Sequence, residues 1–140
     1  PPNTIVQNPE SQQALLNMDF SVPVSVPFDT PVLNATPRDV EDQMREWHGQ
    51  LVRLRFTGRG DLQRLEEQPG YAEVVLWDRR GGMRCLLPAL GLSWIRDIRP
   101  YHADRRRSVY GVVDAHRGVL RLIGRTQKTQ MGNQPTLYSW

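Results

Sequence analysis

Apolar side chains occupy every second position in one stretch near the N-terminus: Phe20, Val22, Val24, Val26 and Phe28. In an extended chain, residues at this spacing all lie on one side. Pro23 and Pro27 interrupt the stretch, and proline removes a donor that a sheet ladder needs. The pattern therefore predicts an extended segment that is restricted to a sheet edge or to a polyproline-like arm.

The next stretch, TPRDVEDQMREWHG at residues 36–49, has the features of an amphipathic helix. Thr36 is a suitable N-cap, Pro37 suits the first helical position, and Gly49 provides a stop. Apolar residues recur at helical spacing at Val40, Met44 and Trp47. We expect this helix to pack on the rest of the protein, or on a partner, through that side only.

From Gln50 onward, short alternating runs are separated by turns that contain glycine. QLVRLRF predicts a strand, and DLQRLEEQ a short helix capped by Asp61. Two hairpins follow: YAEVVLWD with MRCLLPAL around DRRGG, and SVYGVVD with VLRLIGRT around residues 115–118. The pattern favours a mainly β (α+β) fold, a small SH3-like or OB-like barrel or curled antiparallel sheet with one N-terminal amphipathic helix.

Charge and turn-forming residues divide the 140-residue chain unevenly. Residues 1–37 hold three acidic and no basic residues, so the net charge of +3 is −3 on this part and +6 on the rest. Seven of the eleven prolines lie at or before Pro37, and every glycine lies at or after Gly49. We predict an extended, Pro-rich N-terminal arm at residues 1–35, a helix plus small β-barrel domain at 36–125, and a polar C-terminal arm at 126–140. The first residues alone are typical of a disordered leader.

The chemistry-bearing residues exclude several classes of protein. A single cysteine, Cys85, excludes an intrachain disulfide framework and zinc sites built on cysteine pairs, and His48, His102 and His116 are scattered. No nucleophile and base pattern and no phosphate-cradling glycine loop is present. We therefore predict a non-enzyme without catalytic, cofactor-binding or metal-binding residues and without a small-molecule substrate. No signal peptide or membrane span is visible, which favours a virion or cytoplasmic location.

The tripeptide Arg59-Gly60-Asp61 resembles the integrin-binding loop of adhesive proteins. A mechanical interpretation is sufficient, because Gly58 and Gly60 let the chain turn and Asp61 caps the segment that follows. We therefore assign this tripeptide no adhesive role.

The two arms favour a structural role. A small β unit whose arms add strands to neighbouring sheet edges has the design of a subunit of a large assembly, such as a bacteriophage tail, connector or baseplate. The expected partners are other protein subunits, in a homo-oligomer or a hetero-oligomer. The docking residues would be Phe20, Val22, Val24, Val26, Phe28, Val40, Met44 and Trp47.

Arginine and aromatic residues in the second half support an alternative function. An OB-like module could bind single-stranded nucleic acid by holding phosphates and stacking bases. The phosphate contacts would come from Arg79, Arg80, Arg105, Arg106 and Arg107, and the stacking contacts from Trp77, Trp94 and Tyr101. Acidic residues in the same segments, including Asp78 and Asp104, would reduce the positive field. The sequence leaves both functions open.

Overall fold

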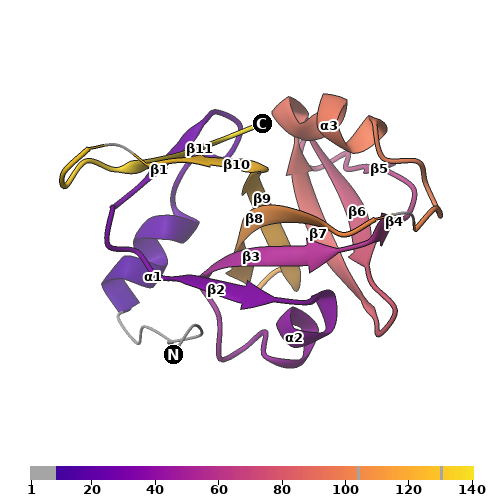
Figure 1. The fold of residues 1–140 in the computed structure, drawn as a ribbon, viewed down its shortest axis with the longest axis horizontal. Helices are drawn as coiled ribbons and strands as arrows, with labels where there is room; N and C mark the ends of the chain where they lie inside the picture. Colours follow the sequence, from indigo (N-terminus) through magenta and orange to yellow (C-terminus); the bar gives the residue numbers. More distant parts are fainter. Residues whose placement is uncertain (1–8, 104, 130) are drawn as a thin grey trace.

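The computed structural model describes residues 9–103, 105–129 and 131–140. Residues 1–8 of the predicted disordered leader (residues 1–18), Asp104 and Gln130 lie outside the described residues, whereas Pro9–Leu16 of that leader form a helix. The fold is mainly β, as predicted, and it contains two separate sheets and short helices (Figure 1). None of the described helices is long and apolar enough to cross a membrane.

The larger sheet has eight strands and is curled. In spatial order they are β2 (Val32–Ala35), β3 (Leu51–Phe56), β8 (Arg107–Asp114), β9 (Val119–Gly124), β7 (Gly82–Pro88), β6 (Tyr71–Trp77) and β4 (Gly58–Arg59), with β5 (Gln63–Arg64) also paired to β6. The pairs β2–β3 and β7–β9 are parallel, so the sheet is mixed where the sequence predicted an antiparallel one. The sheet is not closed into a barrel.

The curl of this sheet has a local cause. Thr57 alone separates β3 from β4, yet β3 is the second strand of the order, between β2 and β8, and β4 is the last strand, paired with β6. One bent stretch of chain therefore pairs with two strands that are far apart in the sheet. The residues before Thr57 pair with β8, and the residues after it pair with β6. The strands that lie between β3 and β4 in the order, namely β8, β9, β7 and β6, therefore curl into an arc.

Both predicted hairpins are confirmed, as β6–β7 and β8–β9. Between them the chain crosses through a 3₁₀ turn, η1 (Ala89–Gly91), and the helix α3 (Leu92–Arg96). The short helix predicted after Asp61 is wrong. Gln63 and Arg64 instead form β5 against Ala72 and Glu73, so backbone pairing to a neighbouring strand overrides the local helical pattern.

The helix at residues 36–49 begins as predicted but is shorter. In α2 (Pro37–Asp42), the Thr36 hydroxyl accepts a hydrogen bond from the Asp39 backbone N–H, and the Asp39 carboxylate accepts one from the Thr36 N–H. Turns replace the helix after Asp42. Gly49, at a φ of 79°, then donates its N–H to the Val113 carbonyl, which directs the chain into β3 beside β8.

The terminal segments, predicted as two extended arms, form the second sheet, so within the described residues they pair with each other and lie on the chain's own body. Here β1 (Val24–Val26) pairs with β11 (Thr136–Ser139), which also pairs with β10 (Thr126–Lys128). The helix α1 (Pro9–Leu16) lies beside this sheet (Figure 1). Prolines at 23 and 27 flank β1, which occupies a sheet edge as predicted. The boundaries near residues 35 and 125 stay a prediction.

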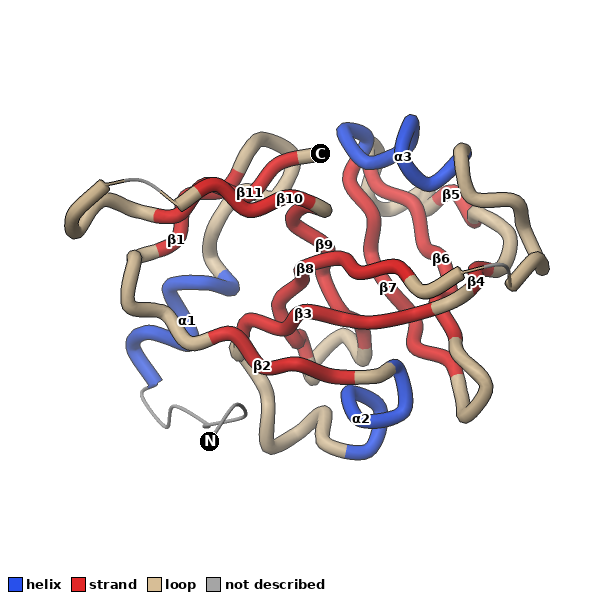
Figure 2. The backbone as a smooth tube through the Cα atoms, viewed as in Figure 1, coloured by secondary structure: helices blue, strands red, loops and turns tan. Residues whose placement is uncertain are grey.

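Figure 2 shows how the strands, helices and loops are arranged. Two apolar cores hold these parts together. The large core fills the inside of the curled sheet, against α2 and α3. The small core lies on the opposite, outer face of the sheet, where the terminal segments cover part of β3, β8 and β9. Its buried members are Leu15, Phe20, Val24, Val26, Leu51, Val112, Ile123 and Tyr138. The terminal segments thus bury their apolar side chains within their own chain.

Candidate nucleic-acid interface

Most of the predicted docking residues take part in the packing of this chain. Phe20, Val24 and Val26 are buried in the small core, Val40 and Trp47 are buried in the large core, and Met44 packs against the large core. Only Val22 and Phe28 are well exposed, at 50% and 52% of their surface. The alternating residues 20–28 therefore fall into two groups: three that are buried in the chain's own core, and two, Val22 and Phe28, that are exposed.

Two of the three aromatic residues predicted to stack on bases lie together. The rings of Trp77, at the end of β6, and Tyr101 have centroids 5.4 Å apart and planes inclined by 38°. Tyr101 is 67% exposed. Trp94 does not join them, because it is buried in α3 against Phe56 and Trp140. A base could not reach the Trp94 ring, so the prediction that Trp94 stacks on bases is wrong.

A glycine sets the position of the Trp77 ring. A Cβ atom added at Gly58 would collide with Nε1 of the indole, so the ring can lie against the backbone of β4 only because residue 58 has no side chain. Tyr101, at a φ of 58°, donates its backbone N–H to the carbonyl of Arg59 in β4. This bond places Tyr101 beside the Trp77 ring, which lies against the same strand. The aromatic pair is therefore held by backbone contacts as well as by the tilted contact between the two rings.

A shallow hollow of about 350 Å³ lies next to this pair, on the outer face of β6 and β7. Val75, which is 37% exposed, and Asp61 both line it, and Asp61 accepts a 3.4 Å hydrogen bond from the Tyr101 hydroxyl. Arg84 donates two hydrogen bonds to the Glu73 carboxylate, at 2.8 and 3.1 Å. These bonds lower the pKa of Glu73. The hollow thus combines an aromatic wall with the ion pair of Arg84 and Glu73, and the carboxylate of Asp61 gives its lining a net charge of −1.

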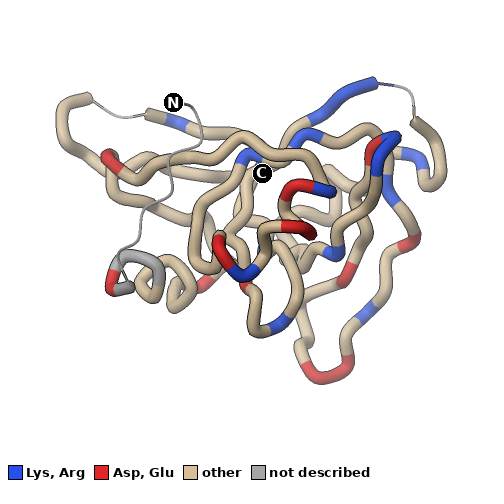
Figure 3. Tube along the Cα trace, turned by 90° about the horizontal axis from the view of Figure 1, so that it is seen from below, with Lys and Arg blue, Asp and Glu red and all other residues tan. Residues whose placement is uncertain are grey.

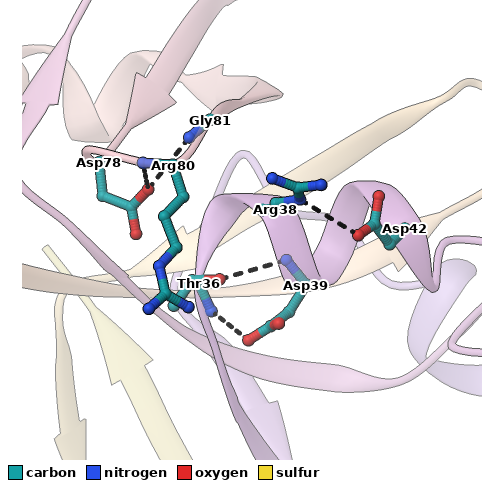
Figure 4. A network of polar contacts seen from close by, with 7 residues as sticks. All are labelled: Thr36, Arg38, Asp39, Asp42, Asp78, Arg80 and Gly81. Atoms are coloured by element: carbon teal, nitrogen blue, oxygen red, sulfur yellow. Dashed lines mark hydrogen bonds and ion pairs between the residues drawn. The ribbon is translucent and has the colours of Figure 1, made fainter.

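Four arginines surround a second hollow, of about 360 Å³, at the end of the same strands. We call it the arginine hollow, and its lining is Thr36, Arg55, Phe56, Thr57, Asp78, Arg79, Arg80 and Arg106. Asp78 is its only acid, and one oxygen of that carboxylate accepts hydrogen bonds from the backbone N–H groups of Arg80 and Gly81. Figure 4 shows the Arg80 side chain reaching from this turn toward Thr36.

The structure thus brings three of the five predicted phosphate contacts together: Arg79, Arg80 and Arg106. Arg105 and Arg107 do not line the hollow, and Arg107 begins β8 half-buried. The sequence analysis missed Arg55, whose alternation with Leu54 and Phe56 in β3 could have indicated an outward side chain. In Figure 3, Lys and Arg gather in the half of the molecule away from the three-stranded sheet.

Other chemistry finds little support. Cys85 is fully buried, and burial raises the pKa of its thiol, which disfavours the nucleophilic thiolate. The rings of His48 and His116 stack with centroids 4.3 Å apart, and His48 Nδ1 accepts a hydrogen bond from the Ala115 N–H. Across the described residues, no group of three or more potential ligands could hold a metal ion.

The tripeptide at residues 59–61 is not presented as an adhesive loop. Arg59 is buried, and its guanidinium donates hydrogen bonds to the carbonyls of Ile98 and Gly60, at 2.8 and 3.1 Å. Burial lowers the pKa of this arginine. Its role is to join β4 to the loop after α3.

Comparison with known proteins adds no family. No family model, curated protein or solved structure matches this chain. Arguments about function therefore rest on the geometry above.

Proposed function

We propose that this protein binds single-stranded nucleic acid across the outer face of β6 and β7. The observation that carries the proposal is the pair formed by the exposed Tyr101 and the half-buried Trp77, beside the arginine hollow. Aromatic rings that stack bases, next to cations that hold phosphates, are the usual parts of such an interface. The chain's net charge of +3 has the sign that favours a polyanion.

The strand connectivity supports an OB-like body. If the bent stretch β3–β4 counts as one strand, the strands β3–β4, β6, β7, β8 and β9 follow the order 1-2-3-5-4. Strands 3 and 5 are parallel, and α3 lies between strands 3 and 4. OB folds are partly open five-stranded barrels that bind oligonucleotides on the face of strands 2 and 3. In this chain those strands are β6 and β7, which carry Trp77 and Arg84.

Fluorescence anisotropy of a labelled oligothymidylate, measured with the full chain at two salt concentrations, tests the proposal. If all four arginines of the hollow hold phosphates, a single-strand slope of about −0.7 per contact predicts an affinity about 50-fold weaker at about 200 mM than at about 50 mM salt. No binding at the lower salt concentration, or binding that salt leaves unchanged, would overturn the proposal.

A matched pair of triple variants locates the interface. The variant R79A/R80A/R106A removes three guanidiniums of the hollow and should flatten the salt slope by about 2 units. The control R45A/R64A/K128A removes the same charge from exposed positions that do not line the hollow, and should keep the slope. Equal effects of the two variants would show that net charge alone attracts the oligonucleotide, and that the hollow is not the site.

A structural subunit of a large assembly, such as a virion, is the second candidate, and the exposure of Val22 and Phe28 favours it. Deleting residues 1–35 would not test it cleanly, because Phe20, Val24 and Val26 support the chain's own core. Sedimentation of the wild type against V22D/F28D is sharper, because both changed side chains point into solvent. An oligomer that the variant dissociates supports this candidate, and a wild type that stays monomeric at high concentration contradicts its homo-oligomeric form.

A further inference from the structure

The arginine hollow concentrates more positive charge than a passing phosphodiester needs. Its four arginines come from three separate places: Arg55 from β3, Arg79 and Arg80 from the turn after β6, and Arg106 from the residue before β8. None of the four forms an ion pair with any residue of the described ranges. Guanidiniums around one opening repel each other unless an anion lies between them.

The carboxylate of Asp78 offsets one of the four arginine charges, so the lining of the hollow keeps a net charge of +3. The Asp78 carboxylate is engaged by backbone N–H groups of its own turn. The Thr36 hydroxyl caps α2, and the Thr57 hydroxyl donates to the Trp77 carbonyl at 3.4 Å. The volume of about 360 Å³ would hold about twelve waters, so a phosphate with its attached sugar fits. The best match in charge is a phosphate monoester, which carries close to two negative charges at pH 7 where a diester carries one.

The surroundings indicate that a strand ends here. Thr36, at the wall of the hollow, leads directly into α2, whose exposed charged side chains are Arg38, Asp39, Glu41 and Asp42, with Arg38 paired to Asp42. A further hollow next to α2 is lined by three acids, Glu41, Asp42 and Glu46, and by one cation, Arg45. A phosphate backbone that continued past the arginines in this direction would meet carboxylates. A strand that crosses the aromatic pair therefore has a favourable place for its last phosphate, and an unfavourable path beyond it.

We propose that the arginine hollow binds the terminal phosphate monoester of a single-stranded nucleic acid whose bases stack on Trp77 and Tyr101. This inference rests on the proposed function and adds a preference for strand ends. A phosphate at the 5′ end or at the 3′ end has the same chemistry, and the polarity of the bound strand decides which one reaches the hollow.

The experiment compares one labelled oligothymidylate in three forms: with a 5′-phosphate, with a 3′-phosphate, and with hydroxyls at both ends. The label is placed inside the strand, and the full chain is titrated by anisotropy at low salt. We expect one phosphorylated form to bind about tenfold more tightly than the form without a terminal phosphate, the gain typical of added hydrogen bonds to a charged group. The form that gains affinity identifies the polarity of the strand.

The two triple variants then assign the preference to the hollow. R79A/R80A/R106A should bind all three forms with equal affinity, whereas R45A/R64A/K128A should keep the tenfold preference. Circular dichroism confirms that both variants fold. Equal affinity of the wild type for all three forms overturns this inference and leaves the proposed function standing. If the wild type binds none of the forms, both proposals are wrong.

Discussion

The outer face of the eight-stranded sheet has two halves that differ in what covers them. Over β3, β8 and β9, the terminal segments bury an apolar core that includes Phe20 and Tyr138. Over β6 and β7 nothing in the described chain does so, and Val75 and Arg84 are exposed. One half of the face is thus sealed by the chain itself, and the other half is accessible to a partner.

The contrast extends to the arginines. On the covered half, Arg121 is half-buried, its Cζ lies 4.3 Å from the centre of the Phe20 ring, and it donates to the Leu16 carbonyl. Burial, with the nearby Arg117, lowers the pKa of Arg121. On the open half, Arg79, Arg80 and Arg106 are exposed around their hollow. The same residue type therefore supports packing on one half and remains available for a ligand on the other.

Two phenylalanines of one segment test the covered half, where the largest effect is expected. Phe20→Ala removes a ring that is 1% exposed, and the cavity should lower the free energy of unfolding by about 3–5 kcal/mol. Phe28→Ala removes a ring that is 52% exposed, and should change it by less than about 0.5 kcal/mol. Urea denaturation followed by circular dichroism measures both values.

If the two substitutions lowered the free energy of unfolding equally, the contrast between a buried Phe20 and an exposed Phe28 would be wrong. If Phe28→Ala were as costly as Phe20→Ala, both rings would be buried in solution, as the assembly hypothesis expects when a partner covers the segment. If neither substitution mattered, the terminal segments would not cover the sheet.

Tyr101 tests the open half, with a smaller effect on affinity. Tyr101→Leu removes an accessible ring, and should weaken oligothymidylate binding by about 1–3 kcal/mol, the usual contribution of one stacked base. Leu and Tyr are similarly strained at the backbone φ of 58°, so the substitution should change the affinity through the lost ring and not through the backbone. Anisotropy titration measures the loss, and Tyr101→Phe, which keeps the ring, should retain most of the affinity.

The control for this prediction is Phe28→Leu, which removes an exposed aromatic ring from the other half of the molecule. It should leave the affinity unchanged. A loss as large as that of Tyr101→Leu would mean that exposed aromatic surface in general attracts the oligonucleotide, so that the pair of Trp77 and Tyr101 has no special role.

Local patterns predicted much of the fold, because they depend on neighbouring residues. The two hairpins and the capped start of α2 at Thr36 follow from turn glycines and an N-cap. The pairing of β1 with β11 could not be predicted, because more than a hundred residues separate Val24 from Tyr138 and no local signal links them. The alternation at residues 20–28 indicated an apolar face, but it could not show that this face belongs to the chain's own core.

The candidate site was predicted only in part, because neighbouring residues can be grouped from the sequence and residues that are distant along the chain cannot. Arg79, Arg80 and Trp77 were found from composition near one turn, and Tyr101 from the next loop. Arg55 was missed, because only the curl of the sheet brings β3 to the end of β6. Trp94 was wrongly included, because composition does not distinguish a buried tryptophan from an accessible one.

The ion pair of Glu73 and Arg84 gives the smallest effect, and it sharpens the comparison of the two halves. The bonds from Arg84 lower the folded-state pKa of Glu73 below its ordinary value of 4.5. The stabilisation is therefore present above that value and is lost as the pH falls through the folded-state pKa. Because the Arg84 side chain is 56% exposed, solvent screening limits the cost of Glu73→Gln to at most about 1 kcal/mol at neutral pH.

Urea denaturation of the wild type and of E73Q at neutral and at acidic pH measures this difference. The gap between the two proteins should be present at neutral pH and should close under acidic conditions, where Glu73 is protonated and resembles glutamine. A gap that stays constant with pH would show that Glu73 contributes through packing and not through charge. The open half would then be held by buried contacts like the covered half, and its availability to a ligand would need another explanation.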